Sequence, residues 1–185
     1  MARLLTFMSV SLDGCFADAQ GGVGFAHAGS DDPEWQAFVA GNASGGGRLL
    51  FGRVTYDMMK SYWPTPMAAQ NDPVVAERMN AYEKYVISRT LTEATWRNTT
   101  LLKGDLVAEV TKLKQGGDVA ILGSGSLVAQ LGEAGLIDDF QIVTCPSVLG
   151  DGKRLFAGVK KPFDLKLTST RSFKNGKVVL NYERA

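Results

Sequence analysis

The sequence predicts an α/β fold built on a largely parallel sheet, for three reasons. Short apolar runs of strand length alternate with segments of helical periodicity along most of the chain, a pattern typical of parallel sheets crossed by helices. Several of these runs end in glycine, serine or arginine. Near the C-terminus, Asn175-Gly176 separates two alternating segments, which predicts an antiparallel hairpin at one edge of the sheet.

The composition is that of one globular domain spanning residues 1–185. The chain is 45% hydrophobic and 21% charged, and its formal net charge of +1 gives it no general attraction to nucleic acid or membranes. A single histidine, His27, and two isolated cysteines, Cys15 and Cys145, argue against a metal site. There is no signal-peptide pattern and no run of membrane-spanning length, so we expect a cytoplasmic protein.

A candidate lid precedes the first helix. Residues 17–30 are rich in glycine and alanine and lack periodicity, and a loop of this length in a compact domain often has a function. Asp32 and Pro33 then begin a helix, because aspartate is a favoured N-cap and proline fits the first helical position. We expect Trp35, Phe38 and Val39 to be buried on this helix. The helix should fade at Gly41, and Gly45-Gly46-Gly47 should break it.

The remaining elements continue the alternation of strands and helices. Predicted strands cover residues 4–10, 49–52, 84–88, 99–102, 119–122 and 140–145. Predicted helices run from residue 53 to the Trp63-Pro64 stop, over 74–82, from the Asp105 cap to Gly116, and over 126–134. A loop at 146–152 and the hairpin segments 164–173 and 177–182 complete the chain.

Three of the predicted strands end in residues suited to phosphate. The endings are Gly52-Arg53, Ser88-Arg89 and Gly123-Ser124-Gly125-Ser126. Taken singly, each is explained by turn geometry or a solvated cation, and the third lacks the last glycine of a dinucleotide fingerprint. Together they would lie at the carboxyl edge of a parallel sheet, where ligands bind, beside helix N-termini that favour phosphate. We therefore predict a site for a phosphate-rich cofactor.

In this order, the motifs resemble the dihydrofolate reductase superfamily. The matching segments are Ser11-Leu12-Asp13-Gly14, Phe51-Gly52-Arg53-Val54-Thr55-Tyr56, Ser88-Arg89-Thr90 and Leu122-Gly123-Ser124-Gly125-Ser126-Leu127. The segment from Pro146 to Phe156 is similar to the reductase domain of the bifunctional riboflavin-biosynthesis deaminase–reductase, whose deaminase motifs are missing here. The segment from Tyr56 to Pro64 resembles the stand-alone bacterial members of this superfamily. The resemblance implies a three-layer fold with a mostly parallel central sheet and a C-terminal antiparallel hairpin, and a homodimer.

The resemblance also implies NADPH as cofactor. The turn from Gly52 through Arg53 to Thr55 would hold the pyrophosphate, and Ser88 with Arg89 would face the adenosine 2′-phosphate, because a permanently charged guanidinium suits a dianion. Residues Gly123, Ser124, Gly125, Ser126 and Leu127 would line the phosphates and the nicotinamide. In the family the Gly123–Ser124 peptide is often cis, and a side chain at Gly125 is expected to block the approach of phosphate.

The acid of dihydrofolate reductases is missing from its expected position. It lies two residues past the proline that opens the helix, which here is Trp35, and a one-residue gap would give Gln36. Weak replacements are Glu34 and Asp13, with Asp31 a further alternative. An indole at this position could stack on a planar heterocycle, so the predicted substrate-binding residues are Trp35, Phe38 and Met59.

These observations favour an NADPH-dependent reductase of a small planar heterocycle, either pterin-like or related to the pyrimidines of riboflavin synthesis. Hydride transfer would come from the nicotinamide, with the proton supplied by water. Two alternatives are a non-catalytic nucleotide-binding or regulatory module of the same fold and a true dihydrofolate reductase with a displaced acid. Expected partners are the small heterocyclic substrate and a second copy of the chain, with neither nucleic acid nor membrane involved.

Overall fold

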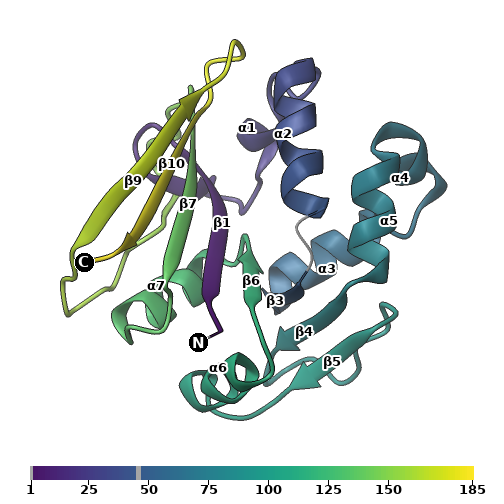
Figure 1. Ribbon diagram of the computed structural model, residues 1–185, viewed down its shortest axis with the longest axis vertical. Coiled ribbons are helices and arrows are strands. Elements are labelled where there is room, and N and C mark those ends of the chain that lie inside the picture. Colours follow the sequence, from purple (N-terminus) through teal and green to yellow (C-terminus); the bar gives the residue numbers. More distant parts are fainter. Residues whose placement is uncertain (1, 45–46) are drawn as a thin grey trace.

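A computed structural model describes residues 2–44 and 47–185 of the chain (Figure 1). Its strands are β1 (Leu4–Ser11), β2 (Cys15–Ala17), β3 (Arg48–Gly52), β4 (Glu83–Ile87), β5 (Thr99–Leu102), β6 (Val119–Leu122), β7 (Asp139–Cys145), β8 (Lys153–Arg154), β9 (Leu165–Ser172) and β10 (Val178–Arg184). Its helices are α1 (Gly24–His27), α2 (Pro33–Ser44), α3 (Arg53–Tyr62), α4 (Pro66–Asn71), α5 (Pro73–Ala81), α6 (Leu106–Gln115) and α7 (Gly125–Glu133).

Within the described residues, eight strands form one sheet in the order β5-β4-β3-β6-β1-β7-β10-β9. Neighbouring strands from β5 to β7 are parallel, whereas β10 pairs antiparallel with both β7 and β9. The prediction of a mostly parallel sheet with an antiparallel C-terminal hairpin is therefore confirmed. Strands β2 and β8 pair separately as a short antiparallel ribbon.

Helices cover both faces of the sheet, and strand alternation decides which side chain meets which layer. On β3, Leu50 belongs to the core cluster that α6 and α7 complete, while Leu49 and Phe51 point to the opposite cluster under α3 and α5. A third cluster, containing Trp35 and Phe173, lies between α2 and the strands β7 and β10. This three-layer arrangement leaves the carboxyl ends of the parallel strands as a common edge (Figure 1).

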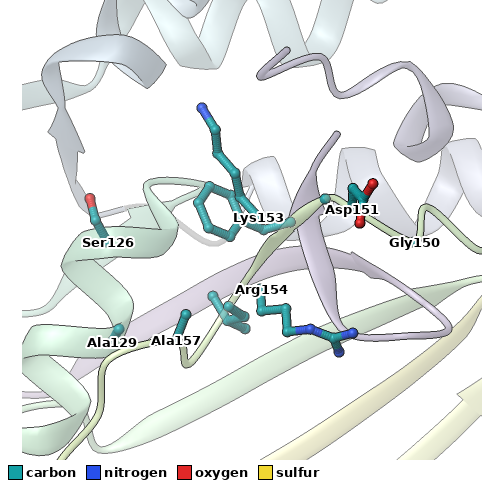
Figure 2. Close-up of a pocket in the computed structure, with 10 residues that line it drawn as sticks. Ser126, Ala129, Gly150, Asp151, Lys153, Arg154 and Ala157 are labelled. Carbon is teal, nitrogen blue, oxygen red and sulfur yellow. The ribbon is translucent and has the colours of Figure 1, made fainter. Parts of the chain in front are cut away.

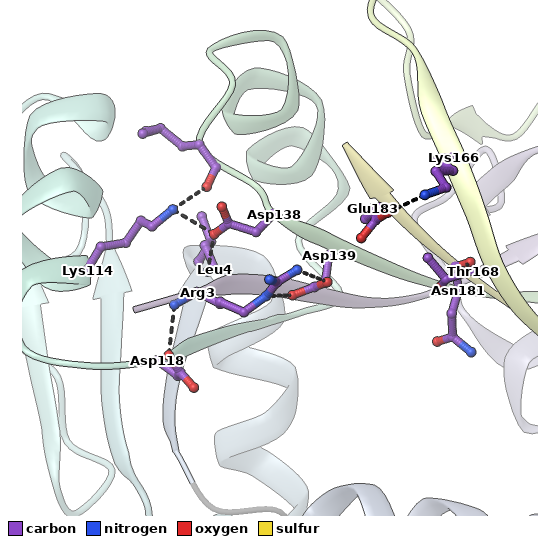
Figure 3. A network of polar contacts seen from close by, with 11 residues as sticks. Arg3, Leu4, Lys114, Asp118, Asp138, Asp139, Lys166, Thr168, Asn181 and Glu183 are labelled. Atoms are coloured by element: carbon purple, nitrogen blue, oxygen red, sulfur yellow. Dashed lines mark hydrogen bonds and ion pairs between the residues drawn. The ribbon is translucent and has the colours of Figure 1, made fainter. Parts of the chain in front are cut away.

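The amino ends of the strands are closed by a polar network (Figure 3). The Arg3 guanidinium donates to the Asp139 carboxylate at 2.5 Å, and the Lys114 ammonium donates to Asp138 at 2.6 Å. Asp138 also accepts from the Leu4 amide at 2.7 Å. These contacts join β1, β7 and α6 at the edge opposite to the predicted cofactor site.

Several expectations need correction. The region 17–30 is not wholly a loop, because it contains the end of β2 and the four-residue α1, both too short to show periodicity. Helix α2 continues past Gly41 to Ser44. Residues 45 and 46 of the predicted glycine breaker lie outside the described residues. Helix α4 was not predicted, although Thr65 caps it by accepting from the Ala68 amide at 3.2 Å.

Candidate functional site

The three phosphate-suited strand endings lie side by side at the carboxyl edge of the sheet. Strand β3 pairs with β4 on one side, where Gly52 is opposite Ile87, and with β6 on the other, so the end of β3 lies between the strands that lead into Ser88 and Gly123. The sequence placed these endings on parallel strands, and the topology makes those strands direct neighbours. Their adjacency creates one continuous edge where a long, phosphate-bearing molecule could lie.

The turn that opens α7 has an unusual backbone. Gly123 and Ser124 both have a φ of 57°, and Ser124 is in the left-handed region. The peptide between them is trans, so the expected cis bond is absent from the described structure. Glycine adopts a positive φ easily, but serine does so at a cost, and local hydrogen bonds must maintain it.

Those hydrogen bonds come from β3 and α3. The Ser124 amide donates to the Thr55 hydroxyl at 3.1 Å, and the Gly52 amide donates to the Ser124 hydroxyl at 2.9 Å. Thr55 is only 9% exposed, so in this conformation its hydroxyl shapes the turn instead of facing solvent. The predicted contact of Thr55 with pyrophosphate stays a prediction. The first amides of α7 have no acceptor within their own helix and remain suited to an anion.

Gly125 is required by a contact that the sequence did not reveal. A Cβ atom at this position would lie 2.5 Å from Cδ1 of Phe16. The ring of Phe16, from β2, therefore covers the first residue of α7. This packing is one reason for glycine at the position, and the close approach of a phosphate to Gly125 stays a prediction.

A pocket of about 620 Å³ lies beside this contact (Figure 2). It is lined by Phe16, Ser126, Ala129, Gly150, Asp151, Gly152, Lys153, Arg154, Leu155 and Ala157. In Figure 2 the Lys153 and Arg154 side chains point in different directions, and the Arg154 guanidinium donates to the Asp13 carbonyl at 2.9 Å. The lysine cation and the start of α7 favour an anionic group, and the carboxylate of Asp151 opposes one.

The two predicted arginines differ in their surroundings. Arg53 forms an exposed ion pair of 3.3 Å with Asp57, one turn further along α3. Arg89 is exposed and has no ion pair with any described residue. The turn before it is shaped by the Ser88 hydroxyl, which accepts from the amides of Thr90 and Leu91 at 3.2 and 3.0 Å. Arg89 is thus held at the tip of a defined turn with its charge available.

The predicted substrate residues are engaged in contacts with other protein side chains, with Trp35 buried and Phe38 and Met59 half-buried. Trp35 is 6% exposed and packs edge-on against Phe173, with ring centroids 5.1 Å apart. Phe38 joins the same group, 5.4 Å from Trp35. Met59 accepts a hydrogen bond at its sulfur from the Trp63 indole at 3.0 Å. Trp35 therefore does not present an open face for stacking in this conformation, and a substrate role for it requires the cluster to open.

Neither of the candidate acids is placed to donate a proton. Glu34 is exposed and pairs with Arg171 on β9 at 2.8 Å. The Asp13 carboxylate accepts from the Ser11 hydroxyl at 2.6 Å and from the amides of Leu149 and Gly150, and these bonds lower its pKa to about 2. An acid with this pKa is ionised at neutral pH, so Asp13 fastens the loop 146–152 to the end of β1.

Asp32 has the structural role that the sequence predicted. Its carboxylate accepts from the Trp35 amide at 2.9 Å, which makes it the N-cap of α2. Among the described residues, no group of three or more acidic, histidine or cysteine side chains could hold a metal ion. None of the helices in the described part of the chain is long and apolar enough to cross a membrane.

The sequence reading missed Lys177. Its side chain is completely buried, and its amine lies 4.5 Å from the centroid of the Trp35 ring. A signal was present, because alternation along 177–182 places Lys177 on the same inward face as Val179.

Comparisons with known proteins agree with this fold. Residues 2–179 match the family model described as the RibD C-terminal domain. The uncharacterized protein YyaP of Bacillus subtilis is 33% identical over 136 residues, 72% of each chain. A putative riboflavin biosynthesis protein from Shewanella sp. PV-4 superposes with a TM-score of 0.75 at 23% identity, covering 100% of this chain and 99% of that one.

A more distant solved structure shows how far the fold extends. Dihydrofolate reductase from Enterococcus faecalis, complexed with NADP(H), superposes with a TM-score of 0.64 at 14% identity, covering 98% of this chain and 96% of the enzyme. The fold is therefore of the dihydrofolate-reductase type, and the match over residues 2–179 assigns the family. The chain belongs to the RibD C-terminal domain family.

Proposed function

We propose that this protein is an NADPH-dependent reductase of a small planar heterocycle, either pterin-like or a pyrimidine of the riboflavin type. The observation that carries the proposal is the single edge formed by the ends of β4, β3 and β6. Two exposed arginines and the start of α7 meet there. Family membership supports a reductase, and the structural relative that is complexed with NADP(H) supports the cofactor.

The residues present fit NADPH in chemical type. Exposed cations at Arg53 and Arg89 suit its pyrophosphate and 2′-phosphate, and the first amides of α7 suit a phosphate oxygen. When bound, NADPH would supply the hydride. The task of this chain would be to bind the two reactants in contact and to exclude water, and neither Glu34 nor Asp13 would take part in proton transfer.

Titration of the purified protein with NADPH and NADH, followed by a scan of heterocyclic oxidants for loss of reduced-nicotinamide absorbance, tests the proposal. We expect NADPH to bind more tightly than NADH and one class of heterocycle to oxidise it. Failure to bind either nucleotide would contradict the proposal. Binding without oxidation by any heterocycle would favour the regulatory module, which the absence of a free acid at Glu34 and Asp13 also supports.

The homodimer implied by the family resemblance is part of the same proposal. Sedimentation equilibrium tests it directly, since a dimer would have twice the 19.9 kDa mass of one chain.

A further inference from the structure

Among the described residues, Lys177 has a buried ammonium group that lacks a hydrogen-bond acceptor. Lys177 is 0% exposed, and its Nζ atom has no hydrogen-bond partner among the described residues. The amine lies over the ring of Trp35, with the nitrogen 4.5 Å from the ring centroid. Buried polar groups are nearly always hydrogen-bonded, so an exception of this kind calls for an explanation.

A second buried lysine shows what a satisfied ammonium looks like in this protein. Lys84 is also 0% exposed and also lies over an indole, 4.6 Å from the centroid of Trp96. Its ammonium donates to the carbonyls of Met79 at 3.0 Å and Tyr82 at 2.6 Å, at the C-terminal end of α5. Lys84 is thus a helix cap, whereas Lys177 shares its burial and its indole contact but has no acceptor.

Lys177 lies where a bound ligand could supply the missing hydrogen-bond acceptor. It immediately precedes Val178, which pairs with Thr144 near the end of β7, and Cys145 in turn pairs with Ser11 at the end of β1. The amine therefore lies at the carboxyl edge of the sheet, beside the first turn of α2. This is the edge that carries the proposed cofactor site.

None of the described groups around the amine accepts a hydrogen bond from it. The titratable neighbours that act on it are the Cys145 thiol from β7 and the Asp32 carboxylate from α2. One oxygen of Asp32 already accepts from the Trp35 amide as the helix cap. Burial raises the pKa of Cys145, which keeps the thiol neutral. Trp35 offers only its ring face.

We propose that Lys177 recognises the substrate of the proposed reductase, and that it selects planar rings with a carbonyl or carboxylate oxygen at this point. The inference rests on the proposed function. An ammonium has three donors and no acceptor, so it binds an oxo or carboxylate edge and disfavours an amino or amidine edge. Trp35 covers the amine, and its side chain must turn aside for the substrate oxygen to take its place.

Two small pyrimidines of opposite hydrogen-bonding character test the proposal. Orotate presents carbonyl and carboxylate oxygens, and 2,4-diaminopyrimidine presents donors on a similar ring. We expect calorimetry to show orotate binding to the NADPH-loaded wild-type protein more tightly than the diamine does. Lys177→Met should weaken orotate at least roughly tenfold and leave NADPH affinity unchanged. Lys174→Met, an exposed lysine of the same hairpin, is the matched control and should change neither.

Equal orotate affinity in a folded Lys177→Met protein would overturn the inference. A wild-type preference for the diamine, or the absence of orotate binding, would do the same. Should the variant not fold, the wild-type protein still decides. Burial lowers the pKa of Lys177, so orotate affinity should fall as pH rises through that pKa, because the ammonium then loses its charge. A pH-independent affinity would contradict the inference.

The two proposals fail separately. If orotate binding depends on Lys177 but NADPH does not bind, the reductase proposal is wrong and the recognition role of Lys177 stands. If a heterocycle oxidises NADPH but binds the Lys177→Met variant as tightly as the wild type, the reductase proposal stands and the recognition role of Lys177 is wrong.

Discussion

The amide of Ser124 donates a hydrogen bond of 3.1 Å to the hydroxyl of Thr55, and this contact joins the start of α7 to the first turn of α3. The two residues are far apart in sequence, and each follows a strand of the central sheet. The bond fixes a serine in the left-handed region at the point where a phosphate is proposed to bind. The geometry of the site therefore depends on a contact between two of its three motifs.

Thr55→Val should destabilise the protein, because valine keeps the shape of threonine and removes the acceptor. A buried amide left without a partner costs about 1–3 kcal/mol, and the free energy of unfolding from urea titration should fall by that amount. Thr55→Ser keeps the hydroxyl and should recover most of the loss. A valine variant as stable as the wild type would show that the Ser124 amide finds another acceptor.

Arg89→Ala should weaken NADPH at least tenfold and leave NADH nearly unchanged, because a charge-assisted contact to the 2′-phosphate is worth about 1.5–3 kcal/mol. Arg53→Ala is the comparison, since a contact to the pyrophosphate would weaken both cofactors equally. Fluorescence titration of each variant with each nucleotide measures the difference. An equal loss for both nucleotides in Arg89→Ala would show that this arginine does not meet the 2′-phosphate.

Gly125→Ala should destabilise the wild-type protein but not a protein that carries Phe16→Ala. In a helix, alanine in place of glycine is ordinarily favourable by about 1 kcal/mol. Here the new methyl group would lie 2.5 Å from the Phe16 ring, and overpacking of this kind costs about 1–3 kcal/mol. Urea unfolding of the two single variants and the double variant measures the coupling. Additive effects would mean that Phe16 does not rest on Gly125 in solution.

Asp13 should make stability depend on pH in the acid range. Its folded-state pKa of about 2 lies below the ordinary value of 3.8, so the unfolded chain binds the proton more readily. The stabilising contribution is complete above the ordinary value and is lost as pH falls through the folded value. Asp13→Asn should therefore be less stable than the wild type at neutral pH and match it at strongly acid pH. Parallel acid-unfolding curves for the two proteins would contradict this.

Residues that act within a few positions of one another were enough to predict most helices and strands, but only part of the candidate site. Asp32 and Pro33 determine where α2 begins, and both act within a few residues, so the sequence was enough. Helix α4 was missed because its cap, Thr65 followed by Pro66, comes directly after the proline that ends α3. The alignment of three strand endings needed only the assumption of a parallel sheet.

What the sequence could not provide are contacts between distant segments. Trp35 is buried because Phe173 and Lys177, on the C-terminal hairpin, pack against it. Gly125 is covered by Phe16 from a ribbon whose strands are too short to detect. Both contacts decide whether a predicted site residue faces a ligand or the protein interior, and neither leaves a periodic signal near the residue concerned.

The last prediction is that this protein reduces dihydrofolate poorly, whatever other substrate it accepts. The position of the dihydrofolate reductase acid is occupied by Trp35, which cannot donate the proton that a pterin needs. The neighbouring Glu34 points outward to Arg171 at 2.8 Å. Loss of general acid catalysis is worth about 10²–10⁴-fold in rate, so only a trace of activity should remain.

Steady-state oxidation of NADPH by dihydrofolate, in the wild type and in Glu34→Gln, measures this directly. We expect the two proteins to be equally slow, because Glu34 is exposed and engaged in an ion pair on the surface of α2. Arg171→Ala is the matched control, since it releases Glu34 from its partner without removing the carboxylate, and it should not raise the rate. Efficient turnover by the wild type that collapses in Glu34→Gln would instead identify a true dihydrofolate reductase whose acid has moved by one residue along the helix.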